Sequence, residues 1–202
     1  MSWALPWVEM PSVSFHVTIS GKTDADGFQY TGGSSQETRI VDINSDTTME
    51  YMTIHSNSAG SYNHLNANGH KLVIGEGVNC TTKKANAYFT LAGGGYGTAA
   101  DTASTDLTVR SGKWRTIYVG GYLADVTGQA KADISGCWVY QNIAPSYRGS
   151  LGSVDLKVSN TTVNSAVAGS AIYAGLSEIK ATAAIAGDVT ITLGENVSAT
   201  VI

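Results

Sequence analysis

The sequence predicts an all-β protein whose short strands stack as a parallel β-solenoid with coils of about 24 residues. The phrase Ser-Gly-x-Trp occurs at residues 111–114 and again at 135–138, and a related phrase, Ser-Asn-Thr-Thr, follows at 159–162. The interval is 24 residues each time. A unit this small cannot bury its own apolar face, whereas stacked copies bury a continuous core.

Each phrase is preceded by one strand-like segment and followed by a second, after which the chain turns a corner. Alternating apolar side chains precede the phrases at residues 106–110, 131–134 and 154–158. Second apolar segments follow at 116–119, 142–144 and 165–168, and Gly- or Pro-containing corners come next at 120–122, 145–149 and 169–170. The same kind of corner appears earlier, at 91–97. Gly and Asn suit corners that need a positive φ. The middle strand reaches its Ser-Gly one residue sooner than the first, which indicates a bulge.

The chain divides into an irregular and a regular part. Residues 1–65 predict an N-terminal cap and irregular early coils, in which Trp3 and Trp7 cover the open end of the stack. Residues 66–202 predict the regular coils, with an Ala-rich inserted corner loop at 164–186. A β-sandwich is the second reading, because alternating strands about ten residues apart fit it as well. Repetition of the whole phrase favours the solenoid.

The composition excludes several classes of protein. Only 14 % of the residues are charged, and the 12 Lys and Arg residues are spread thinly, which argues against nucleic-acid binding. No apolar run is long enough to span a membrane. The N-terminus lacks the pattern of a secretory leader, since Glu9 interrupts its apolar stretch. We expect the chain to be a piece of a longer protein.

Four segments carry a resemblance to a known group of proteins. They are residues 68–78, the Gly-Gly-Gly-Tyr corner at 93–96, Leu-Thr-Val-x-Ser-Gly-x-Trp at 107–114 and Ile-Tyr-Val-Gly-Gly-Tyr at 117–122. About residues 65–202 resemble the right-handed parallel β-helix region of secreted bacterial adhesin-like repeat proteins. The resemblance implies a secreted or cell-surface location, a non-catalytic role as an adhesin or stalk, and polysaccharides or host glycans as partners. It carries over no catalytic residue.

Motifs for metals, cofactors and nucleotides are absent from the sequence, so we expect no cofactor and no metal. The two cysteines, Cys80 and Cys137, have no metal-ligand spacing and are expected to be separate, partly buried thiols, with a disulfide left open. The four histidines share no spacing and are expected at the surface or in loops rather than at a metal.

A polysaccharide lyase or glycoside hydrolase is the alternative function, because such enzymes need converging acidic and basic side chains. The candidates are Asp106, Asp125, Asp133, Asp155, Arg110, Arg115, Lys131 and Lys157. When the segments are aligned by the Ser-Gly phrase, Asp106 falls near Lys131 and then Asp155. This alternating ladder is typical of a solvated face on which charges compensate one another.

Aromatic residues are the most informative group for function. The repeat predicts that Trp114 and Trp138 share one register in successive coils. Rings facing inward would form a core ladder, whereas rings facing outward would form a strip for sugar faces or for a protein partner. For the carbohydrate-binding reading the candidate residues are Trp114, Trp138, Tyr118, Tyr122, Tyr140 and Tyr147, with Arg115 and Arg148 as hydrogen-bond donors. A purely structural spacer is the remaining reading.

The last segment of the sequence predicts a free sheet edge. Residues 189–202 end in strand-like sequence, and an open solenoid end can pair with another edge. An edge-to-edge homodimer is therefore a further expectation.

Overall fold

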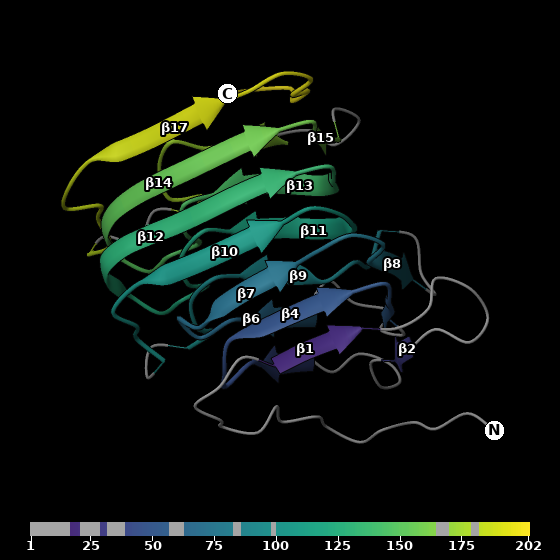
Figure 1. The fold of residues 1–202 in the computed structure, drawn as a ribbon. Helices are drawn as coiled ribbons and strands as arrows, with labels where there is room; N and C mark the ends of the chain where they lie inside the picture. The colour runs from purple at the N-terminus through teal and green to yellow at the C-terminus, as the bar shows by residue number, and fades with distance from the viewer. Residues whose placement is uncertain are drawn as a thin grey trace.

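The chain folds as an all-β solenoid of about five turns, as the repeat predicts. The computed structural model describes residues 17–20, 29–31, 39–56, 63–82, 86–97, 100–164, 170–178 and 182–202. Every strand pairing in this part of the chain is parallel, and each strand lies beside its counterpart from the next coil (Figure 1). The same part of the chain contains no helix that is long and apolar enough to cross a membrane.

Three parallel sheets form the walls of the solenoid. Sheet 1 has the order β1 (Val17–Ser20), β4 (Thr47–Glu50), β7 (Lys71–Ile74), β10 (Thr105–Val109), β12 (Val126–Ser135), β14 (Leu151–Ser159) and β17 (Val189–Leu193). Sheet 2 has the order β15 (Thr162–Val163), β13 (Trp138–Ala144), β11 (Lys113–Tyr118), β9 (Thr90–Ala92), β6 (Asn63–Asn66) and β3 (Arg39–Asp42), and β16 (Ala171–Ile172) also pairs with β13. Sheet 3 consists of β2 (Gln29–Thr31), β5 (Thr53–Ser56) and β8 (Asn79–Thr82).

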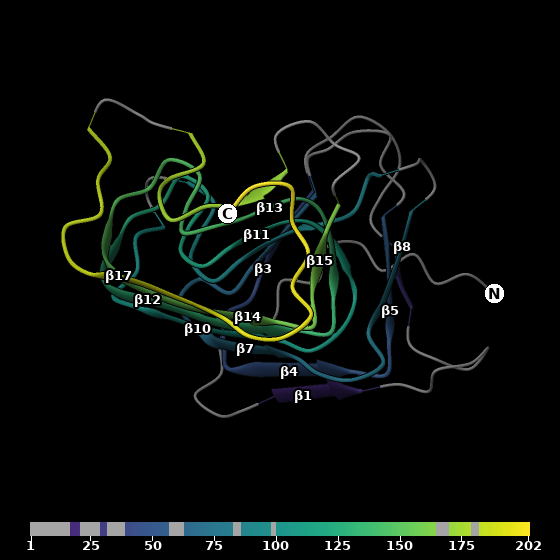
Figure 2. The same cartoon turned by 90° about the horizontal axis from the view of Figure 1, so that it is seen from above.

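The core lies between sheets 1 and 2, which face each other when the molecule is viewed along the stack (Figure 2). In sheet 1, Leu107 lies between Leu72 and Ala132. All three side chains are almost fully buried. Sheet 2 contributes the buried ladder Leu65, Leu91, Ile117, Ile143 and Ile172. Alternation along each strand therefore directs one side chain inward and the next outward.

The predicted coil length holds for the central coils and fails at two places. Leu107 pairs with Ala132 and Ala132 with Leu156, which are offsets of 25 and 24 residues. The offset from Leu156 to Ile191 is 35 residues, 11 more than the offset from Ala132 to Leu156. An equal offset separates Leu72 from Leu107, and the repeat does not reveal this second long coil.

The early coils belong to the same stack as the later ones. Strand β4 pairs with β7, and β3 pairs with β6, so the described strands before residue 66 continue into the regular part. Trp3 and Trp7, which we expected to cover the open end, lie outside the described residues.

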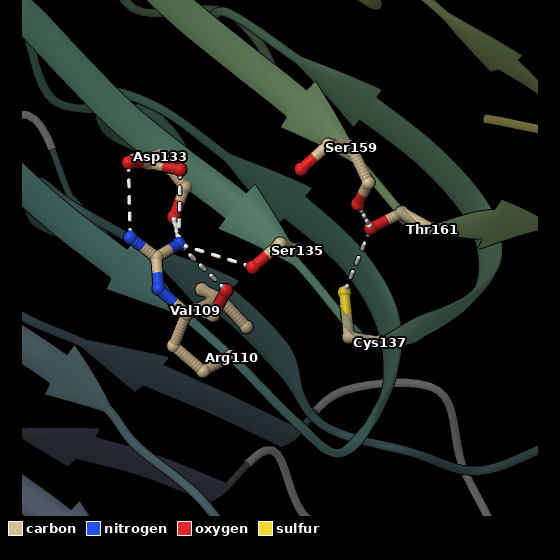
Figure 3. A network of polar contacts seen from close by, with 7 residues as sticks. All are labelled: Val109, Arg110, Asp133, Ser135, Cys137, Ser159 and Thr161. Atoms are coloured by element: carbon tan, nitrogen blue, oxygen red, sulfur yellow. Dashed lines mark hydrogen bonds and ion pairs between the residues drawn. The ribbon is translucent and has the colours of Figure 1, made fainter. Parts of the chain in front are cut away.

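Both cysteines are free thiols inside the solenoid, so the expectation of two separate thiols is confirmed. Burial raises the pKa of Cys80 to about 12 and that of Cys137 to about 11. The Cys137 sulfur lies 3.8 Å from the Thr161 hydroxyl (Figure 3). These thiols are protonated packing groups rather than nucleophiles.

Aspartates repeatedly join one coil to the next where the chain enters sheet 1. The Asp46 carboxylate accepts the backbone N–H of Lys71 at 2.9 Å. Asp101 accepts the N–H of Asp125 at 2.9 Å, and the Asp125 carboxylate accepts the N–H of Ser150 at 2.6 Å. These bonds satisfy backbone donors that lie just outside the strand ladders.

Candidate functional site

The two repeated tryptophans do not share a register, and this corrects the sequence prediction. Trp114 pairs with Val139, whereas Trp138 pairs with Lys113 and Thr162. Val109 pairs with Ile134, and Arg110 stands between Val109 and Ser111, whereas Ser135 follows Ile134 directly. The first phrase therefore begins one residue later in the register than the second. An offset of one residue reverses the face of a strand side chain.

Trp114 accordingly belongs to the core and Trp138 to the outer face of sheet 2. The Trp114 side chain has an exposed fraction of 0 %, and its indole Nε1 donates to the Ser111 carbonyl at 3.1 Å. Trp138 is partly exposed. Trp114 thus lies in the main core, where no ligand can reach it in the folded protein.

Around Trp138 lies a partly exposed group that we call the tryptophan patch: Tyr88, Trp138, Tyr140 and Arg115. The Tyr88 ring meets the Trp138 ring edge to face, with centroids 5.6 Å apart. The Tyr140 ring lies 6.0 Å from Trp138, and the Arg115 guanidinium lies 5.9 Å from the Tyr140 centroid. The patch combines apolar ring surface with a cationic hydrogen-bond donor.

Farther along the same sheet lies a second group, the tyrosine stack of Tyr96, Tyr122 and Tyr147. The Tyr96 and Tyr122 rings are 5.0 Å apart with an interplanar angle of 7°. The Tyr122 and Tyr147 rings are 4.4 Å apart at 9°. Each tyrosine comes from the loop that follows a strand of sheet 2, so three successive coils contribute one ring each.

The loops stack because their backbones hydrogen-bond in parallel, like an extension of the sheet. Gly94 N–H donates to the Gly120 carbonyl at 3.1 Å, Tyr122 N–H to Gly95 at 2.9 Å and Arg148 N–H to Tyr122 at 3.0 Å. A Cβ atom on Gly94 would lie 2.8 Å from the backbone nitrogen of Gly121. The glycine-rich corners therefore allow the close approach that aligns the tyrosines.

The stack rests on the outward side chains of sheet 2. Tyr122 and Tyr147 pack against a small buried cluster formed by Ala92, Tyr118 and Ala144. Burial raises the pKa of Tyr118 and raises that of Tyr122 to about 12, so both phenols are neutral near pH 7. Tyr118 has an exposed fraction of only 6 % and supports the stack from below.

His64 on β6 packs beside Tyr96 and Tyr122, and its burial corrects the expectation of surface histidines. Its ring meets Tyr96 at 4.6 Å and Tyr122 at 4.7 Å, edge to face in both cases. Its exposed fraction is 2 %. Burial, reinforced by the nearby Arg115 charge, lowers the His64 pKa to about 4, so the imidazole is neutral at pH 7.

Arg115 and Arg148 both contact aromatic rings of this surface. The Arg115 charge also contributes to lowering the His64 pKa, and it opposes the rise of the Tyr118 pKa. The Arg148 guanidinium lies 5.0 Å from the Tyr147 centroid and forms an ion pair with Glu178. Apart from Trp114, all the candidate residues for carbohydrate binding thus gather on the outside of sheet 2.

Beside the tyrosine stack lies a depression of about 350 Å³, which the sequence does not reveal. It is lined by Ile40, Asp42, Asn68, Tyr96, Gly97, Ala100, Asp101 and Thr102. A sequence signal existed for Tyr96, because the Gly-Gly-Gly-Tyr corner at 93–96 precedes the Gly-Gly-Tyr corner at 120–122 by one coil. The polar lining comes from separate coils and has no common spacing.

The acidic candidates for catalysis lie on sheet 1 or at its entry, across the core from the aromatic surface. Asp106 pairs with Lys131 and Lys131 with Asp155, so the predicted charge ladder is confirmed. Arg110 donates to both carboxylate oxygens of Asp133 at 2.9 Å (Figure 3). That contact lowers the Asp133 pKa, which keeps this carboxylate ionised at neutral pH.

Among the described residues, His, Cys, Asp and Glu side chains form no group of three that would hold a metal ion. No protein-family model, curated protein or solved structure matches the chain.

Proposed function

We propose that the protein is a non-catalytic carbohydrate-binding module, adhesin-like and secreted or displayed at the cell surface. The proposal is supported by one observation above all. Partly exposed aromatic rings from successive coils gather on the outer face of sheet 2, together with arginine donors. Sugar rings present apolar C–H faces and polar edges, and such a surface offers a partner to both.

Rigidity of the surface favours this use. The rings of the tyrosine stack are held by neighbouring rings and by a backbone ladder, so little side-chain freedom is lost when a ligand binds. Tyr and Trp also supply large contact areas at low entropic cost. A glycan chain that lies along the axis of the solenoid would contact one loop from each successive coil.

The polar composition and the solenoid form fit an extracellular role. Only 14 % of the residues are charged, and the resemblance to adhesin-like repeat proteins implies polysaccharide or host-glycan partners. A structural stalk would use the same architecture with the rings serving only as packing. Binding data distinguish the two functions directly.

The test is binding of the wild-type chain to a glycan and plant-polysaccharide array, with isothermal titration of every positive ligand. Trp138→Ala and Tyr140→Ala remove rings from the tryptophan patch, and Tyr51→Ala removes an exposed ring from another part of the molecule. We expect saturable binding that weakens at least tenfold in the patch variants and is unchanged in Tyr51→Ala. Circular dichroism verifies that each variant is folded. Absence of binding to any glycan, or equal binding by all variants, would refute the proposal.

A further inference from the structure

We infer that the depression beside Tyr96 is a subsite for one uncharged sugar unit, and that it selects neutral glycans over uronic-acid glycans. The inference rests on the proposed carbohydrate-binding function and adds the ligand class. It uses three observations: a tyrosine-stack end that lines the depression, two positioned carboxylates, and no cationic side chain among the described lining residues.

Tyr96 forms the end of the tyrosine stack that lies at the depression. Tyr122 covers one face of the Tyr96 ring. In the preceding coil the chain turns at Asn68 and Gly69, both with positive φ, and His70 N–H donates to the Ala67 carbonyl at 2.9 Å. This tight corner leads directly into β7, and its residues 67–70 include no tyrosine to continue the stack. The Tyr96 ring instead lines the depression, where a sugar ring can take the place of the next tyrosine.

The second observation concerns the two carboxylates. Asp42 Oδ1 accepts from the Asn66 side-chain amide at 3.0 Å, and Asn66 is fully buried. Asp101 Oδ1 accepts the backbone N–H of Asp125 at 2.9 Å. Within the described part of the chain, the Oδ2 atom of each carboxylate has no hydrogen-bond partner. Each carboxylate is thus fixed by one oxygen and offers the other to a hydroxyl donor.

The third observation concerns charge. Among the described residues, the lining contains Asp42 and Asp101 and no Lys or Arg. Arg148, which packs on Tyr147 at the opposite end of the tyrosine stack, is paired with Glu178. A uronate carboxylate placed against Tyr96 would face two like charges without compensation. Neutral hydroxyls would instead donate to those carboxylates.

The size of the depression fits a single sugar unit. Its volume of about 350 Å³ lies at the lower end of the range for small-molecule sites. The remaining units of a bound chain would extend over the tyrosine stack toward Arg148.

The experiment compares neutral and acidic oligosaccharides of equal length by isothermal titration: cellopentaose, xylopentaose and mannopentaose against pentagalacturonate. The variants are Tyr96→Ala and the double variant Asp42→Asn with Asp101→Asn, which retains acceptors for Asn66 and for the Asp125 N–H. Asp106→Asn on sheet 1 is the matched control. We expect the wild type to prefer at least one neutral ligand by tenfold or more, and Tyr96→Ala to lose at least tenfold in affinity for it. The double variant should reduce the neutral-to-acidic preference at least tenfold, and Asp106→Asn should leave it unchanged.

The outcomes separate the subsite from the general function. Preference for pentagalacturonate would overturn the inference while leaving carbohydrate binding intact. So would neutral binding that is lost in Trp138→Ala but unaffected in Tyr96→Ala and in the double variant. Binding that disappears on chelation of divalent cations would identify the carboxylates as a cation site and also overturn it. Absence of binding to every oligosaccharide and polysaccharide would refute the proposed function itself.

Discussion

Replacing the two tryptophans one at a time tests which face of sheet 2 each ring occupies. Trp114→Ala empties a fully buried position and removes the indole donor to the Ser111 carbonyl. Loss of a buried Trp side chain costs about 3–5 kcal/mol, because transfer and cavity terms add. A typical domain has a total stability of about 5–15 kcal/mol, so this loss is a large share of it. Trp138→Ala removes only partly exposed contacts with Tyr88 and Tyr140, and we expect a loss of about 1 kcal/mol.

Urea denaturation monitored by circular dichroism measures both losses on one scale, provided that the slope of free energy against urea is unchanged. Trp114→Phe extends the test if Trp114→Ala fails to fold. It keeps an aromatic ring but removes the indole N–H, so its stability should fall between those of the wild type and the alanine variant. Glycan titration of Trp138→Ala should show a folded protein with impaired binding. Equal destabilisation by the two alanine substitutions, or a larger loss for Trp138→Ala, would refute the one-residue register offset.

Three further predictions concern buried and exposed polar groups. The folded His64 pKa of about 4 lies below its ordinary 6.5, so the unfolded chain binds a proton first as the pH falls. The free energy of unfolding should therefore decrease by about 3 kcal/mol between pH 6.5 and 4, and His64→Gln should lack this component in a pH series of urea titrations. The Arg110–Asp133 pair is partly exposed on both sides, so Asp133→Asn should cost less than about 1 kcal/mol, and the difference from wild type should shrink at high salt. Cys80 and Cys137 should not react with a thiol reagent at pH 8 in the native protein but should react fully in denaturant; rapid native labelling would contradict their burial.

Matching the Ser-Gly phrase predicted the strand register only to within one residue. That was enough to bring Asp106, Lys131 and Asp155 near one another, and these residues do pair in successive strands of sheet 1. The Ser-Gly-x-Trp phrase suggested a tryptophan ladder because Ser111 and Ser135 were treated as equivalent. Pairing of Val109 with Ile134 shows that inward apolar residues, rather than the turn residues, fix the alignment.

The depression could not be predicted from the sequence, and the reason is different. Asp42, Asn68 and Asp101 belong to different coils, and loops of unequal length separate them. Their proximity depends on where each loop leaves the stack. Tyr96 could have been predicted from the sequence, because its glycine corner repeats that of Tyr122. Its role at the depression, however, depends on the absence of a tyrosine from the corner at residues 67–70 in the preceding coil.

The unequal coil lengths bear on which insertions and deletions of residues the fold can accept. Offsets of 24, 25 and 35 residues preserve the same parallel alignment in sheet 1, so extra residues are accommodated in loops outside the stack. In a solenoid each coil contacts only its neighbours. The number of coils therefore sets the length of the stack, and the loops of each coil set its width independently. Excision of residues 107–131 would join Asp106 to Ala132 and shorten the column by one coil while every inward position stays inward. The molecule is modular along its axis, and its reach can be adjusted separately from the surface that each coil presents.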